Sequence, residues 1–169
     1  MSRISSKRFL LFPLAVIAGA ALLLGACGDD DDDGGASLPD PMSRTFYMEA
    51  VEPKGSATID KEAFPDATLP EGGGYGLKEP DDTGKWEVET YTWAPDQLVV
   101  NQGDTVNLEI VGINGARHEA SIDGYADSFV VERGKLTSVS FVAENPGVFK
   151  LICKSHQPAM TGELVVLAR

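Results

Sequence analysis

Three side chains that can bind a soft metal ion lie within eight residues of one another late in the sequence. Cys153 offers a thiolate, His156 an imidazole and Met160 a thioether. These donors are too soft for magnesium or calcium, and as a set they suit copper. The sequence has one other histidine, His118, on an upstream segment that could lie alongside as a second strand. The four residues together predict a copper site.

Two imidazoles, a thiolate and a weak axial methionine are the ligands of blue-copper electron-transfer centres. In this order the residues resemble the cupredoxins, the family of plastocyanin and azurin. The resemblance covers about half of the chain, Trp86 to Arg169, and is supported by the segments 95–106 and 143–149. It implies one mononuclear copper ion held by four side chains. These are His118, Cys153, His156 and Met160.

A second resemblance concerns the number of metal ions. The pattern Trp-x-Pro-x-x-Leu-x-Val, which begins at Trp93, is also similar to the copper domain of cytochrome oxidase subunit II and to nitrosocyanin. The dinuclear centre of the oxidase type needs two cysteines in the loop, whereas this loop contains Cys153 alone. We therefore expect a mononuclear site.

Two of the four predicted ligands, His118 and Met160, fit the family patterns less closely than the others. Nitrosocyanin has a glutamate where His118 falls, and Glu119 is its neighbour; adjacent residues on a strand point to opposite faces, so without a bulge only one of them can face the metal. Three residues separate His156 from Met160, compared with four in plastocyanin-like loops and two in amicyanin-like loops. Met160 is the ligand that this spacing defines least.

Apolar and polar residues alternate with a period of two from about residue 86 onward. Val106, Leu108 and Ile110 alternate with polar residues, as in a half-buried strand. Glycine-containing turns separate such runs at regular spacing. This pattern predicts an all-β fold, an antiparallel β-sandwich with Greek-key connections.

The N-terminal segment has the features of a secretory signal. Three basic residues precede an uncharged run from Phe9 to Ala26, which at 18 residues is just long enough to be considered as a membrane span. The run ends in Leu24-Gly25-Ala26-Cys27, which resembles the bacterial lipobox. This resemblance implies cleavage before Cys27, its lipidation, and an extracytoplasmic protein anchored to a bacterial membrane through lipid.

We expect four segments. Residues 1–26 form the signal peptide, and residues 27–43 form an acidic disordered tether that contains five consecutive aspartates. Residues 44–85 form an irregular extension that could contribute an edge strand over Thr45–Val51; its triplet Gly72-Gly73-Gly74 lacks the Gly-Lys-Ser/Thr of a phosphate loop. Residues 86–169 form the cupredoxin domain.

The net charge and the predicted ligands limit the classes of function that we expect. A net charge of -12 argues against a nucleic-acid partner, because phosphate binding needs clustered Lys and Arg. We expect an electron carrier that exchanges single electrons with a redox protein such as a c-type cytochrome or a respiratory complex. The electron would leave through the ring edge of His156, beside Pro158 and Ala159. Four protein ligands would leave no open position for a substrate, so we do not expect an enzyme.

Two other classes remain open. A copper-binding lipoprotein could store or deliver Cu(I), although such proteins are typically rich in Met or His and this chain has four Met. The domain could instead be a binding or assembly module beside a respiratory complex, with residues 52–85 as its contact surface.

Overall fold

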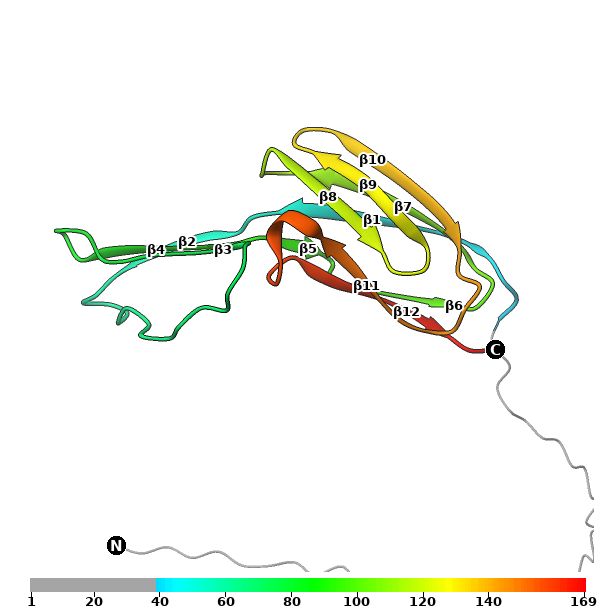
Figure 1. Ribbon diagram of the computed structural model, residues 1–169, viewed down its shortest axis with the longest axis horizontal. Coiled ribbons are helices and arrows are strands. Elements are labelled where there is room, and N and C mark those ends of the chain that lie inside the picture. The colour runs from blue at the N-terminus through cyan, green and yellow to red at the C-terminus, as the bar shows by residue number, and fades with distance from the viewer. Residues whose placement is uncertain (1–38) are drawn as a thin grey trace, which may run out of the picture. The chain divides into compact units, whose positions relative to one another are not determined.

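The computed structural model describes residues 39–169, and this part of the chain folds almost entirely as β-strands (Figure 1). The predicted signal peptide, Cys27 and the tether up to residue 38 lie outside the described residues. Between residues 39 and 169 there is no helix long and apolar enough to cross a membrane.

The described part contains twelve strands and one short 3₁₀ helix. Their bounds are β1 Ser43–Val51, β2 Lys54–Thr58, β3 Tyr75–Lys78, β4 Lys85–Thr90, β5 Thr92–Ala94, β6 Gln97–Asn101, β7 Thr105–Gly112, β8 Arg117–Ile122, β9 Ala126–Glu132, β10 Leu136–Val142, β11 Gly147–Cys153, η1 Lys154–His156 and β12 Thr161–Leu167.

Two sheets form a sandwich. One has the strand order β10-β7-β1-β5 and the other the order β6-β12-β11-β8-β9. Alternate residues of both sheets point into one core, where Leu108 and Ile110 of the first sheet join Leu151 and Leu164 of the second, each exposed by 2% or less. The predicted all-β sandwich is confirmed.

Most strand pairs are antiparallel, and two are parallel. β1 pairs with β7, and β12 pairs with β6, in parallel register. Parallel neighbours need a long crossover connection, and both pairs join strands that are far apart in the sequence. The crossovers bring the N-terminal segment and the C-terminal strand into the interior of the two sheets.

The segment before residue 86 differs from our expectation. β1 pairs with β7 along most of its length and is also paired with β5 over Glu49–Val51, so its C-terminal end is not an edge, and its side chains Met48 and Ala50 are buried in the core. The amide of Met42 donates to Asp104 Oδ1 at 2.9 Å, so the end of the predicted tether is bound to the sandwich. The reason is an alternation of apolar residues in β1 that continues the pattern of the later strands.

Residues 52–85 are also more regular than expected. β2, β4 and β3 form a third, three-stranded sheet, and the boundary predicted at Trp86 falls inside β4. Trp86 is 6% exposed, meets Phe64 edge to face at 6.0 Å and donates from Nε1 to the carbonyl of Glu62 at 3.0 Å. Figure 1 shows this small sheet outside the two sheets of the sandwich. A second, minor core therefore supports the segment.

Candidate metal centre

The core strands β8 and β11 place two of the predicted ligands. Cys153 is the last residue of β11 and pairs with Ala120 of β8. His118 lies two residues before Ala120 on β8 and therefore points to the same face as Ala120. Both side chains are fully buried. Glu119 points the other way, where its half-exposed carboxylate lies 3.6 Å from Lys154 Nζ. The pleat of β8 thus directs the histidine, and not the glutamate, towards Cys153.

The short helix η1 brings in the third predicted ligand, His156. Cys153 Sγ lies 3.3 Å from His156 Nδ1 and 3.8 Å from His118 Nδ1. One donor atom from each of the three residues can be chosen so that all lie within 4.8 Å of one another. Donors that share one ion at bonds of about 2.0–2.3 Å, as zinc does, are separated by distances of this size. The two imidazoles and the thiol therefore fit a single ion that accepts nitrogen and sulfur ligands.

The His118 ring is oriented by a hydrogen bond. Its Nε2 lies 2.9 Å from the backbone carbonyl oxygen of Asn114, which can only accept. Nε2 must then carry the proton, and Nδ1 keeps a free lone pair that faces Cys153. A partner of this kind is the usual way in which proteins fix the tautomer of a ligating histidine.

Burial disfavours the charged forms of the other two groups. Removal from water raises the pKa of the Cys153 thiol and lowers the pKa of the His156 imidazole. Both shifts favour uncharged side chains. A bound cation would stabilise the thiolate that burial disfavours, so the pocket is suited to a positive ion.

Met160 is fully buried beside this cluster. Its carbonyl accepts from the Cys153 amide at 3.1 Å, and its own amide donates to the His156 carbonyl at 2.8 Å. The backbone thus closes the loop from Cys153 to Met160. The role of Met160 as axial ligand stays a prediction.

Gln157 also holds this loop, and sequence reasoning missed it. Its side-chain amide nitrogen donates to the carbonyls of Cys153, at 3.1 Å, and Met160, at 2.9 Å. Its amide oxygen accepts from the Thr161 hydroxyl at 2.9 Å. One side chain therefore ties the two ends of the metal loop together.

The glycine triplet lies against the outside of the same loop. The Gly73 amide donates to the Gln157 carbonyl, and Gly73 forms a β-bridge with Pro158. A Cβ on Gly74 would lie 2.6 Å from the His156 carbonyl oxygen and 2.8 Å from Ala159 Cβ. Only glycine permits this approach, which is the physical reason for the triplet. We call residues 72–74 the glycine strap.

The structure changes our expectation for the surface of His156. The ring is half-buried, and Tyr91 stacks on it with 3.9 Å between ring centroids and 13° between ring planes. Pro158 is exposed, but Ala159 is half-buried beneath the strap. The expected exit at the His156 ring edge is thus partly covered by Tyr91 and the glycine strap.

Comparison with known proteins agrees with this architecture. The family profile described as a cupredoxin-like domain matches residues 69–166, more than half of the chain. The chain belongs to the cupredoxin-like family. This confirms the family inferred from the ligand pattern, and membership implies copper binding, for which the His118, Cys153 and His156 group supplies suitable donors.

Several solved structures resemble this cupredoxin. The copper nitrite reductase from Nitrosomonas europaea is 19% identical over 75% of this chain and 42% of its own, with a TM-score of 0.48. The multicopper oxidase mgLAC is 14% identical over 75% and 39%, with a TM-score of 0.46. A heme-copper terminal oxidase dimer is 20% identical over 42% and 50%, with a TM-score of 0.37. The chain spans half or less of the length of each. No curated protein matches it significantly.

Proposed function

We propose that this cupredoxin is a mononuclear type 1 (blue) copper protein that transfers single electrons between redox partners outside the cytoplasm. The observation that supports this most directly is the convergence of two imidazoles and one buried thiol, with ligand atoms within 4.8 Å. Copper bound there would supply one-electron exchange between Cu(I) and Cu(II).

The residues of the chain would bind and hold the ion with little movement. His118 is held by the Asn114 carbonyl, and Cys153 by the end of β11 and the Met160 carbonyl. Gln157 ties the loop, and Met160 would supply a fourth ligand. With four protein ligands in place no coordination position would be open to a substrate, so we propose that the protein is not an enzyme.

The decisive test is spectroscopic. Cu(II) is added to the purified full chain, and visible absorption and electron paramagnetic resonance are recorded for wild type, Cys153→Ser and Cys27→Ser. We expect an intense thiolate-to-copper charge-transfer band with narrow copper hyperfine splitting. The band should vanish in Cys153→Ser and persist in Cys27→Ser, which is the matched control because it removes the other cysteine.

Two results would contradict the proposal. A copper signal that survives in Cys153→Ser would place the ion elsewhere. A protein that binds Cu(I) tightly but gives no band dependent on Cys153 would favour the alternative of copper storage or delivery.

We also propose a lipid anchor at Cys27 and a positively charged redox partner such as a c-type cytochrome. The net charge of -12 supports such a partner, because opposite charges accelerate encounter. The rate of electron transfer to a basic cytochrome should fall as ionic strength rises, since the screening length is about 10 Å at 0.1 M salt. A rate that does not change with salt would contradict electrostatic steering.

Mass spectrometry of membrane-extracted protein would test for acyl chains on Cys27.

A further inference from the structure

Tyr91 contacts both histidines of the site. Its ring stacks on the His156 ring at 3.9 Å, and its edge meets the His118 ring at 5.7 Å with 62° between the planes. Tyr91 lies between β4 and β5, and its amide donates to the Gly74 carbonyl at 2.8 Å. The glycine strap and the tyrosine are therefore hydrogen-bonded parts of one wall against the metal loop.

The two histidines differ in how their rings are held. His118 has the Asn114 carbonyl as a partner for Nε2. Among the side-chain hydrogen bonds of residues 39–169, the one that involves the His156 ring joins Nδ1 to Cys153, so Nε2 has no protein partner there. Ligating histidines are normally oriented by a hydrogen bond from the second ring nitrogen. At His156 the ring is oriented instead by the stacked ring of Tyr91.

Glu52 is bound by Asn114, the residue whose backbone carbonyl orients His118. Glu52 is 8% exposed, and the Asn114 side chain binds both its backbone and its carboxylate. The Glu52 amide donates to Asn114 Oδ1 at 2.6 Å. Asn114 Nδ2 lies 3.0 Å from the Glu52 carbonyl oxygen and 3.3 Å from Glu52 Oε2. Burial and then the nearby Glu52 carboxylate raise the pKa of Tyr91. Asn114 thus contacts Glu52 through its side chain and His118 through its carbonyl.

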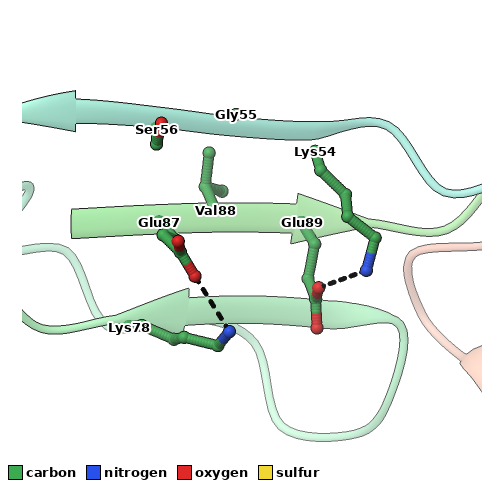
Figure 2. Close-up of a pocket in the computed structure, with 7 residues that line it drawn as sticks. All are labelled: Lys54, Gly55, Ser56, Lys78, Glu87, Val88 and Glu89. Atoms are coloured by element: carbon green, nitrogen blue, oxygen red, sulfur yellow. Dashed lines mark hydrogen bonds and ion pairs between the residues drawn. The ribbon is translucent and has the colours of Figure 1, made fainter.

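The position of Glu52 is in turn stabilised from the small sheet. Lys54 Nζ lies 3.1 Å from Glu52 Oε2 and 2.8 Å from Glu89 Oε2. Figure 2 shows Lys54 on β2 reaching across to Glu89 on the neighbouring strand β4. The three-stranded sheet therefore connects to the metal site through charged groups as well as through the strap.

We propose that Tyr91 is a positioning residue that fixes the ring plane of His156 and shields one face of that ring from water. The inference rests on the proposed copper site, because it takes His156 to be a ligand. It assigns to residues 52–91 a part in shaping the metal centre, which a bare sandwich would lack.

The experiment compares Tyr91→Leu and Tyr91→Phe with Tyr125→Leu. Tyr125 packs on Phe141 and Phe149 with centroids 4.9 and 4.8 Å away, so its loss removes comparable aromatic packing outside the site. The first readout needs no copper: nuclear magnetic resonance of the His156 ring protons in the metal-free full chain. We expect ring contacts between Tyr91 and His156 in wild type, and ring-current shifts that disappear in Tyr91→Leu and persist in Tyr91→Phe.

The second readout is the copper site itself. We expect Tyr91→Leu to weaken Cu(II) binding by about tenfold, the lower end of the range for residues that orient ligands. Its charge-transfer band and reduction potential should also change. Tyr91→Phe should retain the affinity with a smaller change in potential. Tyr125→Leu should lower the thermal midpoint while leaving affinity, band and potential as in wild type.

The possible results separate the two proposals. If wild type shows no band dependent on Cys153, the proposed function fails, and the metal-free ring contacts still decide whether Tyr91 positions His156. If wild type shows the band but Tyr91→Leu has unchanged affinity, band and potential, the positioning role is overturned. If Tyr91→Leu does not fold, absence of ring contacts between Tyr91 and His156 in wild type would overturn it equally.

Discussion

The two histidines of the metal centre are held by different parts of the molecule. His118 lies on β8 inside the sandwich, is fully buried and is oriented by a backbone carbonyl. His156 lies in the short helix η1, is half-buried and is covered by Tyr91 and the glycine strap. The first is positioned by the pleat of a strand, and the second by contacts with a segment outside the sandwich. One ion bound by both rings would therefore couple the sandwich to its extension.

The difference between His118 and His156 can be tested first by removing each imidazole ring. We expect both His118→Gly and His156→Gly to lose the copper band completely. Imidazole added to the solution should restore the band in His156→Gly, because that position is half-exposed, and should not restore it in the fully buried His118→Gly. Titration of both variants with imidazole under visible absorption checks this. Rescue of His118→Gly would show that the two positions do not differ in access.

A second test concerns the strap. Gly74 has φ +83 and no room for a Cβ, whereas Gly134 has φ +74 and nothing within 4 Å of the position of a Cβ. Gly134→Ala should cost about 1 kcal/mol in the free energy of unfolding, from backbone strain alone. Gly74→Ala should cost on the order of 3 kcal/mol, because a close contact adds to that strain.

Urea unfolding of the two glycine variants measures this difference, and copper titration tests whether the strap matters to the site. We expect weaker copper binding in Gly74→Ala only. Equal unfolding free energies for the two variants would mean that the strap does not press on the metal loop.

A third test concerns the sandwich alone. Burial raises the pKa of Asp104, but hydrogen bonds from the Met42 and Asn101 amides and from Arg44 outweigh it and lower this pKa to about 2, from a usual value of 3.8. Because the folded value is the lower one, the stabilisation is present above pH 4 and is lost as pH falls towards 2. Its size is about 2 kcal/mol.

Chemical denaturation between pH 7 and pH 2 measures this contribution. Asp104→Asn should remove this contribution to the dependence on pH, while Asp60→Asn, at an exposed turn, should retain it. Neither variant should alter the copper band. An unchanged pH profile in Asp104→Asn would contradict the assignment of this carboxylate to the stability of the sandwich.

The amino-acid sequence by itself determined the donor set and the fold class. Cys153, His156, Met160 and His118 are chemically distinctive, and the alternation of residues such as Val106, Leu108 and Ile110 is a local consequence of the pleat, so both can be read without coordinates. The same alternation is present in β1, and it indicated a strand packed on the core, which our prediction of an edge strand did not take into account.

Tertiary structure alone decided the surroundings of the ligands. The choice of His118 over Glu119 needed the register of β8 against β11. The roles of Gly74, Tyr91 and Glu52 arise from contacts between segments far apart in the chain; Glu52 and Asn114, for example, are 62 positions apart. Such contacts leave no period in the local sequence, because they depend on how a whole segment folds back over the metal loop.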